Sequence, residues 1–139
     1  MHIKVPFLAV LFMSLFQLSV FAVENDEYSA KNFSEIFPLN QADISEITVD
    51  DYSSRTHSIK DKARIEEVLH YFDQFQYKRL RNDQTSFMPD NTLMIHFDDG
   101  ERTTFIIPYK KEMMLDNKVY KLKGGELSEE KLLDLFDIQ

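Results

Sequence analysis

Hydrophobic and polar residues alternate on both sides of Asp98-Asp99-Gly100, within the segment Thr92–Tyr109. Alternation with a period of two is typical of β-strands that bury one face, and an Asp-Gly pair between two such runs favours a tight turn. The pattern therefore predicts a β-hairpin, and the other predicted elements can be arranged around it.

Two pairing registers are compatible with this hairpin. A two-residue loop pairs Ile95 with Thr104 and leaves both faces mixed. A type I turn at Asp98-Asp99, with Gly100 as a left-handed bulge residue, pairs Ile95 with Thr103 instead. Because a one-residue slip exchanges the faces of a strand, the cleaner separation of apolar from polar residues favours the bulged turn. In that register one face carries Leu93, Ile95, Phe97, Thr103, Phe105 and Ile107. The other carries Met94, His96, Arg102 and Thr104, with Ile106 as its one strongly apolar residue.

The segment Asp61–Phe75 has the clearest helical pattern, because its apolar residues recur at spacings of three and four. Asp61 suits the N-cap position of this helix. We expect the apolar stripe to lie across the inner face of a sheet. A type I′ turn is expected at Asp116-Asn117, and Ser128 suits the cap of a last helix. The remaining predicted strands are Ile44–Asp50, Arg55–Ile59, Gln76–Arg81, Lys111–Leu115 and Lys118–Lys123, and the remaining helices are Ser29–Phe37 and Glu129–Ile138.

Hairpins and helices that do not alternate as strand, helix and parallel strand indicate the α+β class. We expect a single antiparallel β-sheet built from hairpins, packed by one main amphipathic helix, with a short C-terminal helix. Residues 23–43 begin with the acidic run Glu24–Glu27 and are expected to form an acidic N-terminal lead-in. Residues 44–139 are expected to form the single α+β domain.

The first 22 residues have a different composition from the rest of the chain. Lys4 precedes an apolar run from Val5 to Phe16, and Val20-Phe21-Ala22 suits signal peptidase. The alternative interpretation is a transmembrane anchor, but polar residues interrupt the run and it is short for a spanning helix. We therefore expect a cleaved signal peptide, export to the periplasm or the extracellular medium, and no stable membrane insertion after cleavage.

The chain is acidic, with a formal net charge of −8 at pH 7. Nucleic-acid binding is not expected, because neutralising phosphates requires an excess of cations. A basic protein is favoured as a partner on electrostatic grounds, although negative charge also serves solubility. The sequence contains no cysteine, so disulfides and thiolate metal sites are excluded.

Recognisable catalytic, nucleotide and metal motifs are absent from the sequence. The three glycines cannot form a phosphate-binding loop, and His57, His70 and His96 have no metal-binding spacing. No GxSxG or SxxK motif surrounds any serine. We therefore expect a protein that is not an enzyme and needs no cofactor or metal.

The loop Asn82–Asn91 is polar except for Phe87 and Met88, which either pack into the core or contact a partner. In the second case the loop and the acidic turn of the hairpin form one surface, where apolar anchors hold a partner and acids steer it. The expected partner-binding residues are Phe87, Met88, Asp98, Asp99 and Glu101.

These observations favour an exported non-enzymatic binding module, such as a protein-binding inhibitor, an immunity protein or an envelope accessory protein. One alternative is a small-ligand carrier with a pocket between helix and sheet, lined by Phe72, Phe97 and Phe105. A second alternative is a small hydrolase that uses His96 or His57.

Overall fold

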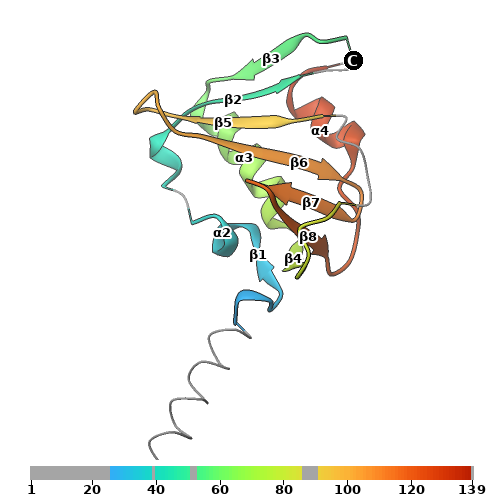
Figure 1. Cartoon of the computed structure of the whole chain (residues 1–139). Coiled ribbons are helices and arrows are strands. Elements are labelled where there is room, and N and C mark those ends of the chain that lie inside the picture. Colours follow the sequence, from blue (N-terminus) through green and yellow to red (C-terminus); the bar gives the residue numbers. More distant parts are fainter. Residues whose placement is uncertain (1–25, 39, 51–52, 86–90, 139) are drawn as a thin grey trace, which may run out of the picture.

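The computed structural model describes residues 26–38, 40–50, 53–85 and 91–138. They form one antiparallel sheet with the strand order β1-β4-β8-β7-β6-β5-β2-β3, packed by helices (Figure 1). The predicted α+β fold is confirmed. The strands are β1 (Lys31–Asn32), β2 (Ile44–Asp50), β3 (Thr56–Ile59), β4 (Gln76–Arg79), β5 (Leu93–Phe97), β6 (Thr103–Tyr109), β7 (Glu112–Leu115) and β8 (Lys118–Leu122).

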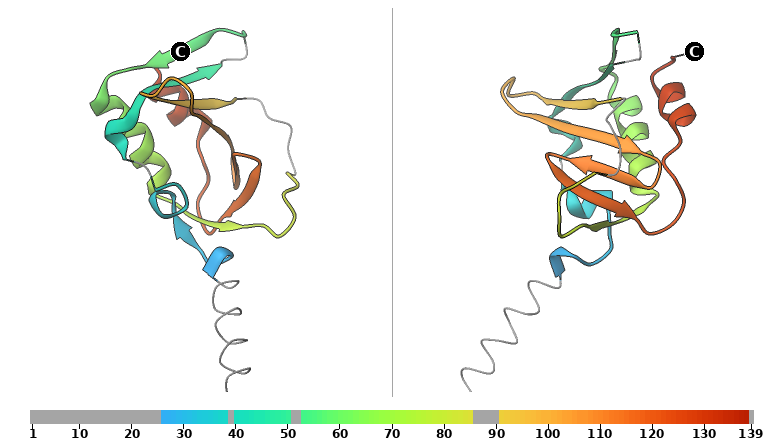
Figure 2. Two further views of the ribbon diagram at one scale, coloured as in Figure 1. Left: turned by 60° about the vertical axis from the view of Figure 1, so that its left-hand side comes forward. Right: turned by 45° about the vertical axis from the view of Figure 1, so that its right-hand side comes forward.

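The main helix α3 (Lys62–Asp73) and the C-terminal helix α4 (Glu129–Leu135) lie on the same side of the sheet (Figure 2). Each begins at the predicted cap. The Asp61 carboxylate accepts a hydrogen bond from the Arg64 amide at 3.1 Å, and the Ser128 hydroxyl accepts one from the Lys131 amide at 3.3 Å. These bonds satisfy amide groups that a helix start leaves without partners. A short helix α2 (Phe33–Ile36) and the 3-10 turn η1 (Gln41–Asp43) complete the helical elements of the described residues.

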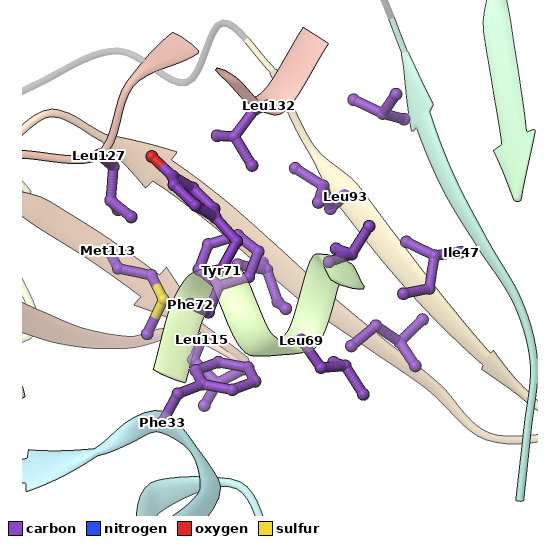
Figure 3. Packing of buried hydrophobic residues seen from close by; sticks show 14 of the residues in the cluster. Phe33, Ile47, Leu69, Tyr71, Phe72, Leu93, Met113, Leu115, Leu127 and Leu132 are labelled. Carbon is purple, nitrogen blue, oxygen red and sulfur yellow. The ribbon is translucent and has the colours of Figure 1, made fainter. Parts of the chain in front are cut away.

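The core lies between α3 and one face of the sheet (Figure 3). Burying one such apolar side chain contributes about 1.5–3 kcal/mol, so this layer supplies most of the stability. The Tyr77 hydroxyl donates a hydrogen bond to the Phe72 carbonyl at 2.7 Å within it. Burial raises the pKa of that hydroxyl far above its ordinary value, so Tyr77 stays a neutral donor. The residues that α3 buries are Ile65, Val68, Leu69, Tyr71 and Phe72.

Part of the segment expected as a lead-in belongs to the sheet and the core. Lys31 pairs with Tyr77, which makes β1 an edge strand beside β4. Phe33 begins α2 and is 3% exposed. The predicted docking of aromatic residues from this segment is confirmed, but Lys31–Asn32 form a strand where a helix was expected. Strand pairing ties this segment to a β4 that lies far along the sequence, which local periodicity cannot reveal.

The register chosen for the central hairpin is wrong by one residue. Ile95 pairs with Thr104, and Phe97 donates its amide hydrogen to the Arg102 carbonyl at 3.3 Å. The turn itself begins as expected: Gly100 has φ 72° and donates to the Phe97 carbonyl at 3.0 Å. Glu101 also lies in the loop, so the closing pair moves to Arg102 and every later residue of β6 changes face.

The second predicted hairpin is confirmed. Asp116 and Asn117 have φ angles of 45° and 66°, as the type I′ turn requires. Met113 pairs with Tyr120, which places both side chains in the core. Asp and Asn tolerate the left-handed conformation better than other residues with a side chain, so the local sequence was sufficient here.

Candidate functional site

The two faces of the sheet are covered differently. Side chains that point toward α3 form the core cluster together with buried residues of all three helices. Within the described residues, none of the helices contributes to the opposite face, which we call the open face. The alternating register identifies its members on the central strands as Glu46 and Thr48 (β2), Met94 and His96 (β5), Thr103, Phe105 and Ile107 (β6), Met114 (β7) and Val119 (β8). At the β8 end of this face Val119 is nevertheless 0% exposed, beside Leu80, whose amide donates to the Val119 carbonyl at 2.8 Å.

A strip of apolar side chains crosses the middle of the open face. Met94 lies beside Phe105, and Ile107 lies beside Met114 on the next strand. Phe105 is 47% exposed. Among the described residues, the one other large hydrophobic residue with so much exposed surface is Tyr109, at 36%. Met94, Phe105, Ile107 and Met114 are here called the apolar strip. An exposed group of large apolar side chains on a folded surface is typical of a contact site.

Phe105 is held in place by the strand ladder rather than by a helix. Its amide donates to the Asp116 carboxylate at 2.9 Å, and its carbonyl accepts from the Asp116 amide at 3.1 Å. The backbone beneath the ring is thus paired on that side, while almost half of the side chain meets solvent. Because the backbone of Phe105 is already fixed, binding costs little backbone entropy, which favours the use of this aromatic side chain as an anchor.

Polar residues border the strip on the side of β2. The Nε2 atom of His96 lies 3.1 Å from the Thr48 hydroxyl, and its Nδ1 atom lies 3.5 Å from the Thr103 hydroxyl. Both ring nitrogens therefore face hydroxyl groups of neighbouring strands. This bridge accounts for His96 as a surface contact between strands. The carboxylate of its cross-strand neighbour Glu46 accepts a hydrogen bond from the Ser58 hydroxyl and lies 3.9 Å from the Lys60 ammonium.

The two histidines considered for a hydrolase, His57 and His96, lie on opposite faces of the sheet. His57 pairs with Val49, whose side chain belongs to the core face, while His96 pairs with Glu46 on the open face. The sheet thus separates the two rings. Among the residues that the structure describes, no group of three His, Cys, Asp or Glu side chains is placed to hold a metal ion.

The acidic residues predicted for binding lie together in the exposed loop between β5 and β6. Asp99 is occupied within this loop: its carboxylate accepts hydrogen bonds from the amides of Glu101 and Arg102, both at 3.0 Å, and forms an ion pair with the Arg102 side chain at 2.5 Å. The Arg102 guanidinium and these amides lower the pKa of Asp99 to about 2. Asp98 lies 4.0 Å from the Lys62 ammonium. Asp99 thus stabilises the loop, while Asp98 and Glu101 remain on its surface.

Phe87 and Met88 lie outside the described residues, so their predicted role stays a prediction. The aromatic residues expected to line a pocket are separated. Phe72 and Phe97 are 0% and 5% exposed inside the core, whereas Phe105 points to the open face. None of the grooves found on the described part of the chain is lined by these three residues.

Sequence reasoning missed the apolar strip, although a signal for it was present. The segment from Thr103 to Ile107 carries large apolar residues at both even and odd positions. Such a pattern is typical of a strand with contacts on both faces. Ile106 was the sign of this arrangement, because no register could place every large side chain of β6 on one face.

No family model, no curated protein sequence and no solved structure matches the chain. In the described residues, none of the helices combines the length and apolar character needed to cross a membrane.

Proposed function

We propose that this chain is an exported, non-enzymatic protein-binding module, of the inhibitor, immunity or envelope accessory type. The contact surface is the apolar strip on the open face. The observation that carries this proposal is Phe105, 47% exposed on a strand that is central to the sheet. Its neighbours Met94 and Met114 are part-buried, and methionine and aromatic residues are enriched at the centres of protein interfaces.

Export is supported by the character of residues 1–22, where an early lysine precedes an apolar run and a cleavage-like sequence. The non-enzymatic character is supported by His96, whose ring nitrogens face two threonine hydroxyls, while the carboxylate of its neighbour Glu46 pairs with Ser58 and Lys60. The net charge of −8 favours a basic partner, because opposite charge raises the rate of encounter and penalises acidic competitors.

The test is capture of a partner with two matched phenylalanine variants. The full chain, made in its host with a C-terminal tag, is exposed to envelope extract and culture fluid at physiological salt. Retained proteins are identified by mass spectrometry. Phe105→Ser removes the central anchor, while Phe37→Ser removes a part-buried phenylalanine on the helical side of the molecule. Thermal unfolding of both variants establishes that each is folded.

We expect a stoichiometric basic protein on wild type and on Phe37→Ser, and a loss of about 10-fold or more in affinity with Phe105→Ser, as is typical of an interface anchor. Equal retention by a folded Phe105→Ser variant would show that the strip is not the contact surface. If no protein is retained in stoichiometric amount, the protein-binding function itself is wrong.

A further inference from the structure

A groove between α2 and α3 lies on the helical side of the molecule, away from the apolar strip. Its volume is about 480 Å³, against about 310 and 420 Å³ for the two other grooves described. Pockets that hold small molecules fall in the range of about 300–1,000 Å³. The groove is lined by Phe33, Ser34, Phe37, Pro38, Asn40, Leu69, His70 and Asp73.

The base of the groove is aromatic and aliphatic. Phe33 and Leu69 are 3% and 6% exposed, and both belong to the core cluster, so this wall is rigid. The Phe37 ring lies 5.6 Å from the Phe33 ring at an angle of 59°, and it is only partly buried. An apolar group can therefore pack against the exposed part of Phe37, with Phe33 and Leu69 as the buried floor of the groove.

One carboxylate stands in the wall of this groove. Asp73 is the last residue of α3, and its Oδ1 atom accepts a hydrogen bond from the Ser34 amide at 2.8 Å. The C-terminal end of a helix carries partial negative charge from its free carbonyl groups. A carboxylate at that position adds negative charge to it, so the site favours a positively charged group.

Two other titratable side chains of α3 lie near Asp73. His70 is the only basic residue in the last turn of α3, and it is exposed at the edge of the groove. Glu66 lies four residues before it on the same helix and does not line the groove. Phenylalanine rings, moreover, attract cations through their faces.

We propose that the groove binds a small organic cation, namely a primary or quaternary ammonium joined to an apolar group. The apolar group packs on Phe33, Phe37 and Leu69, and the ammonium pairs with the Asp73 carboxylate. This site is independent of the protein-binding face, since no residue is shared between them.

The test uses three probes that differ in charge and share a phenyl group: 2-phenylethylamine, 2-phenylethanol and 3-phenylpropanoate. Binding to the full chain is measured by titration calorimetry and by the shifts of nuclear magnetic resonance signals from the groove. The amine should bind about 10-fold or more tightly than the alcohol, as expected for one charge-assisted hydrogen bond, and the carboxylate should bind least.

Variants then assign the contacts. Asp73→Asn keeps an acceptor for the Ser34 amide but removes the charge, so it should weaken amine binding about 10-fold and leave alcohol binding unchanged. Phe37→Ser should weaken both. Glu66→Gln, on the same helix, and Phe105→Ser, on the open face, are the matched controls and should bind all probes as wild type does.

Equal affinity of wild type for the amine and the alcohol would overturn the proposal without any variant. It would also be overturned if Asp73→Asn bound the amine as tightly as wild type, or if the amine shifted no signal from the groove.

Discussion

The two faces of the sheet are built from the same strands and differ in what covers them. On the core face, α3 covers residues such as Ile47 and Ile95, both 0% exposed. On the open face, Phe105 is 47% exposed and its neighbours are only part-buried. Both faces nevertheless carry large apolar side chains. An apolar sheet face therefore indicates that something packs against it. Only the presence or absence of a covering element shows whether that contact is made within the chain or with another molecule.

The strongest test of this comparison is the removal of a core-face contact. Phe72→Ala deletes a ring that is 0% exposed in the last turn of α3. We expect a loss of about 3–5 kcal/mol in the free energy of unfolding, because the cavity adds to the lost transfer energy. Urea unfolding followed by circular dichroism measures it. A loss below about 1 kcal/mol would contradict the assignment of this face as the core.

A smaller effect is expected from a buried polar group in the same layer. Tyr77→Phe removes the hydroxyl that donates to the Phe72 carbonyl and leaves that carbonyl with the longer hydrogen bond from the Phe75 amide at 3.4 Å. We expect a loss of about 0.5–1.5 kcal/mol in the free energy of unfolding, the net contribution of one hydrogen bond. The same urea measurement applies. An unchanged stability would mean that solvent reaches this carbonyl.

The matching change on the open face should hardly affect stability. Phe105→Ala removes a side chain of the same type as Phe72→Ala, but one that is 47% exposed. We expect a change below about 1 kcal/mol in the free energy of unfolding, as for most surface substitutions. If Phe105→Ala destabilised the chain as much as Phe72→Ala, the strip would be part of a second core and not a contact surface.

The stabilisation that Asp99 gives to the loop between β5 and β6 should depend on pH only in acid. The pKa of Asp99 lies near 2 in the folded chain, below its ordinary value of 3.8. Its stabilising contribution is therefore complete above the unfolded pKa and is lost as the pH falls through about 2. Asp99→Asn should flatten the dependence of the urea midpoint on pH between 4 and 2, a window taken from these two values.

Arg102→Gln should flatten the same curve, because the Arg102 side chain is the main cause of the lowered pKa. If Asp99→Asn followed the wild-type curve throughout, the ion pair between these residues would be absent in solution.

Local chemistry made several elements predictable. The spacing of apolar residues and the Asp61 cap specify α3, and Asp116-Asn117 specify the turn between β7 and β8. These features depend on neighbours within a few residues, where backbone sterics and nearby hydrogen bonds dominate. The α+β class followed from the same short-range signals.

The candidate site was only partly predictable. The sequence identified the acidic loop at Asp98-Asp99, but the structure uses Asp99 to hold that loop together. The apolar strip was not foreseen, because Phe105 was assigned to the core face. The groove between α2 and α3 joins residues as distant as Ser34 and Asp73, and no local pattern links them.

The sequence by itself thus determined the main helix, the caps of α3 and α4, the turn between β7 and β8 and the fold class of this protein. Tertiary structure alone decided the register of β6, the addition of β1 beside β4 and the face that stays open. The physical reason is that β6 is apolar on both sides, so its own pattern is nearly balanced between two registers. The docking of α3, which buries Ile106 and leaves Phe105 exposed, breaks that balance.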